Sequence, residues 1–319
     1  MEGPLSPEVE EVHPAPPARV TIREVGPRDG LQAEQPLPVG ARVRLIEAVG
    51  ATGVPKIEAV SFVSPKAVPA MADAAAVWAR VTPVEGVAYS ALVPNRRGAE
   101  EAVRAGGFAS LQAFIAASDG YNRRNLGKTV EESLEDVMEV LRVGRGAGIP
   151  VECTISAAFG DPYEGEVPAE RVIALASRLV EAGAAGISLG DTTGLARTDH
   201  VRQMVGTFLE GLTGVPLNLH FHETGGTGSA LANVVAAMEV GAEEFDASVG
   251  GMGGSPFAPG AGGNVATEDL VRTLSDMGIE SGVDLDRVLD AARLAESLVG
   301  HPLPSRRSAA GRPRSGGDA

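Results

Sequence analysis

Short apolar segments rich in β-branched residues alternate with longer, alanine-rich segments along nearly the whole chain. Eight short segments have the length and composition of buried strands. They are VTIREV, KIEAVSF, VAYSALV, LQAFIAAS, VECTISAAF, GISLGD, LNLHFHE and FDASVGG, which begin at residues 20, 56, 87, 111, 151, 186, 217 and 245. Apolar strands separated by single helices pair in parallel, so the pattern predicts an α/β fold.

The number of units distinguishes two parallel architectures. Eight strand–helix units in about 280 residues fit a single closed (β/α)8 TIM barrel better than an open doubly wound sheet. No change in composition divides the chain, so we expect one domain over 19–302. It is flanked by an acidic, proline-rich tail over 1–18 and a second tail over 303–319, both predicted to be disordered. Helices are expected over 38–53, 67–80, 96–105, 130–148, 169–183 and 199–212.

Charge and composition exclude several classes of function. The formal net charge is −15, and no sustained basic stripe is present, which argues against nucleic acid and anionic membrane surfaces as partners. No apolar run approaches the roughly 20 residues of a membrane helix. The first residues lack the features of a targeting peptide, so we expect a cytoplasmic protein. The single cysteine, Cys153, excludes an internal disulfide framework and indicates a small buried side chain.

Polar side chains gather where the predicted strands end, which is the end of a barrel that carries catalytic groups. A glycine-rich loop follows the eighth strand as well. The strand-end residues are Arg28, Asp29, Glu58, Ser61, Asp191, Thr192, His220 and His222.

His220 and His222 are separated by one residue within a predicted strand. Side chains at i and i+2 of a strand share a face, so both imidazoles can point at one place. A buried or surface role would be the better explanation for one histidine alone. For a pair at a strand's carboxyl end, the spacing predicts a metal site.

The dipeptide Arg28–Asp29 lies in a turn made tight by neighbouring glycine and proline residues. It is interpreted either as a surface turn pair or as a functional pair. In the functional interpretation, Asp29 gives an oxygen to a cation and Arg28 stabilises a developing oxyanion. The dipeptide by itself favours the surface turn.

The loop over 250–270 is too rich in glycine to form a long regular element. Its position after the eighth strand predicts a mobile lid over the active site, with a plain surface loop as the alternative. We expect the lid to end at a helix that begins near Asn264. The Asn264 amide oxygen could then reach the same metal.

Several segments, in this order along the chain, together resemble the 3-hydroxy-3-methylglutaryl-CoA lyase family of metal-dependent lyases and condensing enzymes on (β/α)8 barrels. Alone, HFH or RDG would be weak, but the full set is specific and spans about residues 20–270. The segments are VGPRDGLQ, IEAVSFVSPK followed by PAMAD, DPYEG, SLGDTTG, HFHET, FDASVGGMGG and APGAGGNVATEDL.

The resemblance implies one divalent cation, Mg²⁺ or Mn²⁺, and an acyl-CoA substrate. Mixed carboxylate, amide and imidazole ligands with open positions suit these ions better than a closed zinc site, although zinc remains an alternative. The implied reaction cleaves a tertiary 3-hydroxyacyl-CoA, with 3-hydroxy-3-methylglutaryl-CoA as the leading substrate, to acetyl-CoA and a 3-oxo acid such as acetoacetate. The implied metal ligands are Asp29, His220, His222 and Asn264.

The resemblance also assigns roles around the metal. Arg28 would neutralise the thioester enolate, and Glu58 would act as a catalytic or ligand-orienting carboxylate. Asp29 and His220 would serve in catalysis as well as in metal binding. The implied substrate-binding residues are Ser61, Asp191, Thr192 and Gly254, although an Asp-Thr pair after a strand is also an ordinary helix-capping pattern.

Two departures from the family's pattern put the substrate in doubt. Ser255 occupies the position of a loop cysteine that is held to transfer protons, and a serine hydroxyl is a much weaker acid than a thiol. Ser255 could relay a proton or only bind the substrate. In addition, Glu223 replaces an aspartate after the histidines, and the following TGGTGSALAN segment is about two residues longer than usual.

Two alternative functions stay open. One is a Claisen-type condensation of acetyl-CoA with a 2-oxo acid, and the other is a non-catalytic acyl-CoA-binding paralogue. Lys66, Arg123 and Arg124 are candidates for binding the CoA phosphates, or they are solvated surface cations. Members of the family are often dimers, so a homodimer is compatible with the sequence.

Overall fold

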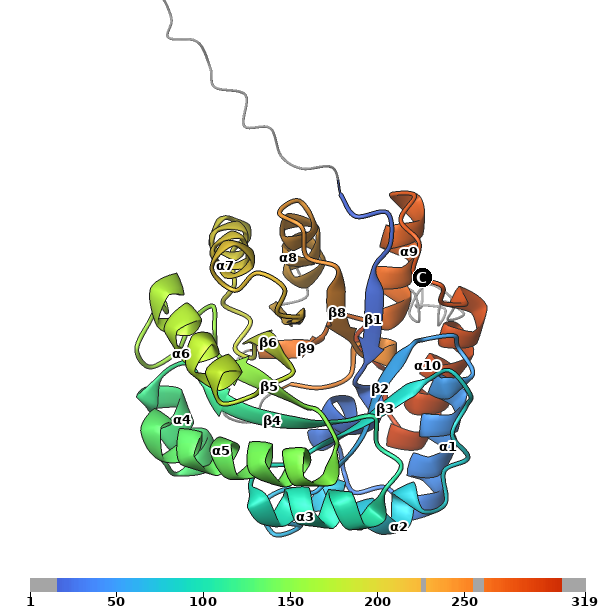
Figure 1. Ribbon diagram of the computed structural model, residues 1–319. Helices are drawn as coiled ribbons and strands as arrows, with labels where there is room; N and C mark the ends of the chain where they lie inside the picture. The colour runs from blue at the N-terminus through green and yellow to red at the C-terminus, as the bar shows by residue number, and fades with distance from the viewer. Residues whose placement is uncertain (1–15, 225–227, 255–260, 306–319) are drawn as a thin grey trace, which may run out of the picture.

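The computed structural model describes residues 16–224, 228–254 and 261–305. Eight parallel strands form a closed barrel, because each pairs with its neighbours in sequence, β8 pairs with β1, and β6 pairs with β7 (Figure 1). The expected (β/α)8 architecture is therefore confirmed. The strands are β1 (Thr21–Glu24), β2 (Lys56–Ser61), β3 (Ala88–Leu92), β4 (Ser110–Ala116), β5 (Val151–Ser156), β6 (Gly186–Asp191), β7 (Leu217–Thr224) and β8 (Glu244–Ala247).

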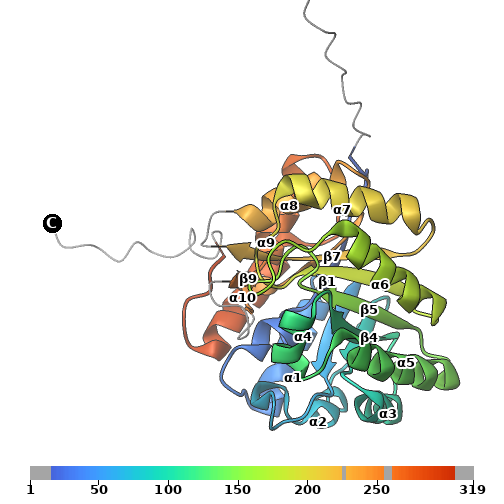
Figure 2. The same cartoon turned by 90° about the vertical axis from the view of Figure 1, so that its left-hand side faces the viewer.

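Helices surround the barrel, and each barrel strand is followed in the chain by at least one helix (Figures 1 and 2). None of the helices in the described parts of the chain is both long and apolar enough to cross a bilayer. The helices are α1 (Val39–Gly50), α2 (Ala74–Trp78), α3 (Arg96–Ala105), α4 (Asp119–Leu126), α5 (Val130–Ala147), α6 (Ala169–Glu181), α7 (Thr198–Gly211), α8 (Ser229–Met238), α9 (Thr267–Asp276) and α10 (Leu285–Val299).

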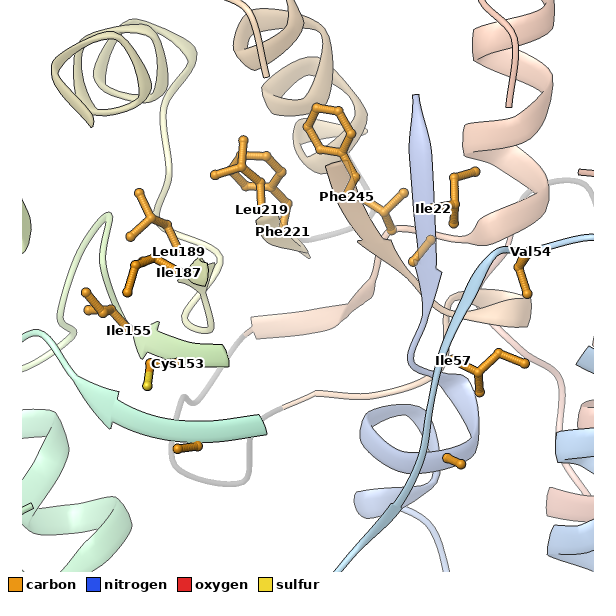
Figure 3. Close-up of a cluster of buried hydrophobic side chains, with 14 of the residues drawn as sticks. Ile22, Val54, Ile57, Cys153, Ile155, Ile187, Leu189, Leu219, Phe221 and Phe245 are labelled. Atoms are coloured by element: carbon orange, nitrogen blue, oxygen red, sulfur yellow. The ribbon is translucent and has the colours of Figure 1, made fainter. Parts of the chain in front are cut away.

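The apolar core lies between the strands and the surrounding helices. Figure 3 shows part of it, with labelled side chains from β1, β2, β5, β6, β7 and β8. Cys153 belongs to this cluster, and burial, with a smaller contribution from Glu152, raises the pKa of its thiol to about 12. Cys153 is thus the small buried side chain that the sequence predicted. The raised pKa keeps its thiol protonated and therefore unreactive.

The interior of the barrel, by contrast, is polar. Arg23 on β1 contacts both Asp246 on β8 and Glu152 on β5. Since β1 and β5 are not neighbours in the barrel wall, their side chains can meet only inside it. Strand alternation then explains why the flanking residues Ile22 and Phe245 face the helices, while Arg23 and Asp246 face inward.

The structure corrects two local expectations. The helix predicted over 67–80 is reduced to a 3-10 turn (Pro69–Met71) and the short α2, because Asp73 takes a left-handed conformation with φ of 59°. Asn264 does not begin a helix. It ends β9 (Ala261–Asn264), which pairs antiparallel with β7 and places Asn264 opposite His222, and α9 starts at Thr267.

The described structure extends past residue 303, where the disordered C-terminal tail was expected to begin. Leu303 and Ser305 are buried, and the Ser305 N–H donates to the carbonyl of Gly250. The predicted lid between β8 and β9 falls partly on 255–260, outside the described residues, and so does Ser255.

Candidate active site

Three chain segments far apart in sequence meet at the carboxyl end of the barrel. Asp29 lies in the helical turn Gly26–Gly30, which follows β1. The two histidines lie on β7, and Asn264 ends β9. The Asp29 Oδ2 atom is 3.9 Å from Nε2 of both His220 and His222. The ligand atoms of these three residues all lie within 4.8 Å of one another, which makes them a possible metal site.

The hydrogen bonds of the two imidazoles direct their second nitrogens at each other. His220 Nδ1 lies 2.9 Å from a carboxylate oxygen of Asp246, and His222 Nδ1 lies 3.2 Å from the carbonyl oxygen of Gly262. Because a carbonyl oxygen can only accept, His222 carries its proton on Nδ1 and presents a lone pair at Nε2. The two Nε2 atoms are 2.8 Å apart.

Such a pair of nitrogens repels unless a proton or a metal cation lies between them. Burial, reinforced by His220, lowers the pKa of His222 to about 4, whereas Asp246 and Asp29 outweigh burial and raise the pKa of His220. The pair therefore carries at most one positive charge near neutral pH, and the extra proton of that form belongs to His220. A cation bound by both nitrogens would satisfy both lone pairs, so these residues fit a metal ion.

Asn264 supports the same interpretation. Its amide nitrogen donates to Asp29 Oδ2 at 2.8 Å and to the carbonyl of Met252 at 2.9 Å. Its oxygen is buried and has no hydrogen-bond partner among the described residues. Gly253 permits this approach, because a Cβ there would lie 2.4 Å from the Asn264 amide nitrogen.

Arg28 joins Asp29 to Glu58. Its guanidinium donates to Asp29 Oδ1 at 2.6 Å and to Glu58 Oε2 at 2.5 Å. Burial alone would raise the pKa of Asp29, but Arg28 and the two imidazoles hold it at about 2. All three side chains are largely shielded from solvent, so the surface-turn interpretation of Arg28–Asp29 is wrong.

Asp191 and Thr192 have local structural contacts. Asp191 Oδ1 accepts from the backbone N–H groups of Leu195 and Ala196, and Thr192 Oγ1 accepts from that of Ala157. The second Asp191 oxygen is buried without a partner in the described chain. Burial raises the pKa of Asp191 to about 7 despite those N–H groups. Leu195 and Ala196 both precede α7, whose N-cap Arg197 has no side-chain cap, so the helix-capping alternative is wrong for Asp191.

The remaining predicted residues are further from this cluster or outside the description. Ser61 is buried and lines a groove of about 630 Å³ beside α2 and α3, and no described hydrogen bond joins it to the metal-site cluster. Gly254 is the last described residue before the gap that contains Ser255. Glu223 accepts hydrogen bonds from the backbone of Gly228 and Ala230 at the start of α8. Residues 225–227 of the longer segment lie outside the described chain.

Sequence reasoning missed the charged residues beneath the histidines. Asp246 accepts from Arg23 through both oxygens, at 2.7 and 3.0 Å, and is 4% exposed. The available signal was a charged residue within each of two short predicted strands, Arg23 in VTIREV and Asp246 in FDASVGG. Such residues face the barrel interior whenever their neighbours face the helices.

The fold and the site together define a class of protein. They are those of a (β/α)8-barrel enzyme with a candidate metal site, built from imidazole, carboxylate and amide groups at the carboxyl ends of its strands. The family model described as HMGL-like matches residues 19–295. The chain therefore belongs to the HMGL-like family, and by its family it is a carbon–carbon lyase.

Curated relatives match over nearly their whole length. The chain is 44% identical over 292 residues to the hydroxymethylglutaryl-CoA lyase YngG of Bacillus subtilis (strain 168), covering 91% of this chain and 96% of that protein. It is 45% identical over 288 residues to the hydroxymethylglutaryl-CoA lyase of Pseudomonas mevalonii, covering 90% and 95%.

Solved structures agree. An HMG-CoA lyase from Acinetobacter baumannii, in complex with coenzyme A and 3-methylmalate, superimposes with a TM-score of 0.88 at 38% identity, covering 95% of this chain and 98% of that one. The Bacillus subtilis HMG-CoA lyase also gives a TM-score of 0.88, at 42% identity and coverage of 92% and 98%. The resemblance to this family that the sequence motifs indicated is confirmed.

Proposed function

We propose that the protein cleaves 3-hydroxy-3-methylglutaryl-CoA to acetyl-CoA and acetoacetate with the help of one divalent cation. The observation that carries this proposal is the convergence of Asp29, His220, His222 and Asn264 beside the Arg28–Glu58 pair. The names of the curated relatives support the substrate. A related tertiary 3-hydroxyacyl-CoA is the close alternative.

The cation would be held by Asp29, His220, His222 and the free Asn264 oxygen. One carboxylate and one amide oxygen beside two imidazoles suit Mg²⁺ or Mn²⁺, with other positions left for water or substrate. When bound, such an ion supplies Lewis acidity that lowers the pKa of a substrate hydroxyl. Comparing activity and metal binding with Mg²⁺, Mn²⁺ and Zn²⁺ will identify the cation.

Arg28 and Glu58 provide the charge and the proton acceptor of the cleavage step. The Arg28 guanidinium is fixed by two carboxylates and keeps its Nε free of described partners, so it can stabilise the enolate oxygen of the leaving acetyl-CoA half. Glu58 Oε1 is buried and also lacks a described partner. We assign Glu58 as the group that accepts the substrate's hydroxyl proton, or that orients the group accepting it.

Substrate binding is assigned to the loops around this site. Asp191, Thr192, Ser61 and Gly254 would form the wall of the pocket. The second Asp191 oxygen and the Ser61 hydroxyl are the stronger candidates among them, because both are buried without a described partner. The ligands of the Acinetobacter baumannii lyase, coenzyme A and a hydroxy diacid, support a thioester substrate bearing a carboxylate.

The CoA phosphates would meet the basic residues of the same barrel end. Arg123 and Arg124 lie on α4 after β4, and Lys66 is exposed in the loop after β2. The Arg124 guanidinium lies 3.6 Å from the ring centroid of Tyr163, in the loop after β5. Arg123→Ala and Arg124→Ala should raise KM for the CoA substrate and leave kcat nearly unchanged.

The experiment that tests the proposal is incubation of purified protein with 3-hydroxy-3-methylglutaryl-CoA and Mg²⁺ or Mn²⁺. Release of acetyl-CoA and acetoacetate, abolished by EDTA, is the expected result. No acyl-CoA product from any tertiary 3-hydroxyacyl-CoA would overturn it. Free thiol released from acetyl-CoA and a 2-oxo acid would instead support a condensing enzyme, and binding without turnover would support a non-catalytic paralogue.

Ser255 is proposed as the group that returns a proton to the enolate, directly or through water, in place of a cysteine. Because a thiol is much more acidic than a hydroxyl, Ser255→Cys should raise kcat if this position handles protons. An unchanged kcat would assign proton transfer to another residue.

Cytoplasmic localisation and a homodimer stay predictions, to be checked by cell fractionation and by light scattering.

A further inference from the structure

A buried chain of charged groups runs through the barrel interior beneath His220. It consists of Asp246 on β8, Arg23 on β1 and Glu152 on β5. We propose that Asp246, held in place by Arg23, is a positioning residue that fixes the orientation and tautomer of His220 for cation binding. This inference rests on the proposed metal site, and it gives roles to two residues outside the catalytic set.

The contacts of Asp246 leave its carboxylate little freedom. Oδ1 accepts from Arg23 Nε at 2.7 Å and from Asn218 Nδ2 at 3.0 Å. Oδ2 accepts from Arg23 Nη2 at 3.0 Å and lies 2.9 Å from His220 Nδ1. A carboxylate held on both oxygens by a planar guanidinium cannot rotate without breaking charge-assisted hydrogen bonds. The plane of the His220 ring is fixed in turn.

The same contacts decide which nitrogen of His220 is free. Arg23 donates to both oxygens of Asp246, at 2.7 and 3.0 Å, and a side chain held in this two-point way by a guanidinium is an ionised carboxylate. An ionised carboxylate only accepts, so a neutral His220 imidazole carries its proton on Nδ1 and keeps the Nε2 lone pair for a cation. A carboxylate partner also makes the imidazole a stronger ligand.

The two histidines therefore differ in their support. His222 Nδ1 meets only a backbone carbonyl, that of Gly262, at 3.2 Å, whereas His220 meets a buried ion pair at 2.9 Å. Backbone support is independent of side-chain identity. Substituting Asp246 removes the carboxylate that contacts His220 and leaves the contact of His222 with the Gly262 carbonyl in place. The effect of Asp246 on metal binding can therefore be measured by mutagenesis.

Arg23 makes this arrangement possible in the fold. A lone carboxylate inside the barrel would be costly to bury, and Arg23 compensates its charge. Glu152 occupies the opposite side of Arg23, where its Oε2 accepts from Arg23 Nη1 at 3.0 Å and from Gln112 Nε2 at 2.9 Å. Glu152 contacts neither histidine in the described structure, so it provides a matched control carboxylate.

The test measures Mn²⁺ affinity by EPR titration of purified protein without substrate, for wild type, Asp246→Asn and Glu152→Gln. Each variant removes one negative charge beside Arg23. We expect Asp246→Asn to weaken Mn²⁺ binding roughly 10–100-fold, the range found for groups that orient metal ligands. Glu152→Gln should stay within about twofold of wild type, since it leaves the His220 contact intact.

Asp246→Asn also leaves the Arg23 charge buried with less compensation, which could impair folding. The double variant Arg23→Met with Asp246→Asn removes both charges, and it should unfold at a temperature close to wild type while still binding Mn²⁺ weakly. Wild-type Mn²⁺ affinity in the folded double variant would overturn the inference. So would an equal loss of affinity in Glu152→Gln, because the effect would then be one of net charge.

These outcomes are separate from the fate of the proposed reaction. If wild type binds Mn²⁺ but cleaves no acyl-CoA, the lyase proposal fails while the role of Asp246 is still measured by affinity. If wild type binds no Mn²⁺, Mg²⁺ or Zn²⁺ at all, the metal site fails, and the role of Asp246 fails with it.

Discussion

Replacing Glu24 by glutamine is expected to change how the stability of the protein depends on pH. Glu24 ends β1 and is fully buried. Its Oε1 atom accepts from the backbone N–H groups of Gly26 at 2.8 Å and Val249 at 2.9 Å, and its Oε2 accepts from the hydroxyl of Thr267. The side chain thus joins the Asp29 turn to the start of the glycine-rich loop and to α9.

Burial raises the pKa of Glu24 from 4.5 to about 8, although the three hydrogen bonds oppose the shift. Between these two values the folded protein keeps a proton that the unfolded chain loses. The contribution of Glu24 to stability is therefore fully present below pH 4.5 and is lost as the pH rises towards 8. From pH 5 to pH 8 this linkage lowers the free energy of unfolding by about 3–4 kcal/mol.

Glutamine has no titratable proton, but its amide oxygen can still accept from both N–H groups. The free energy of unfolding should be measured by urea titration at pH 5, 6, 7 and 8 for wild type, Glu24→Gln and the exposed control Glu181→Gln. The free energy of unfolding of Glu24→Gln minus that of wild type should increase by about 3–4 kcal/mol from pH 5 to pH 8. The same difference for Glu181→Gln should stay constant over this pH range. Parallel curves for wild type and Glu24→Gln would refute the reasoning.

Three further outcomes are expected. Gly250→Ala should cost about 2 kcal/mol more in urea unfolding than Gly278→Ala: both have φ of 72°, but a Cβ at Gly250 would lie 2.2 Å from the Leu303 side chain, and one at Gly278 meets nothing within 4 Å. Thr129→Ala should cost about 1 kcal/mol by removing the capping box of α5, with an unchanged urea midpoint as the contrary result. Mn²⁺ at about 100 times its Kd should stabilise wild type by about 2.7 kcal/mol and His222→Ala by much less, as measured by thermal unfolding with and without EDTA.

The family resemblance and the barrel followed from local patterns. Eight apolar segments at regular spacing fix the parallel pairing, because buried strands between helices have few other ways to satisfy their backbone hydrogen bonds. The pair His220–His222 could be placed on one face because the side-chain period of a strand is two residues. The helix expected over 67–80 failed where a single left-handed residue, Asp73, interrupts the chain.

The sequence by itself determined the fold class, the family and the residue types of the site. Tertiary structure alone decided that Asn264 reaches Asp29, 235 positions away in the chain, from a strand rather than from a helix. It also decided that Arg23 and Asp246 meet beneath His220. The physical reason is that local propensity determines which segments become strands and helices, whereas barrel closure and strand register determine which inward side chains face one another.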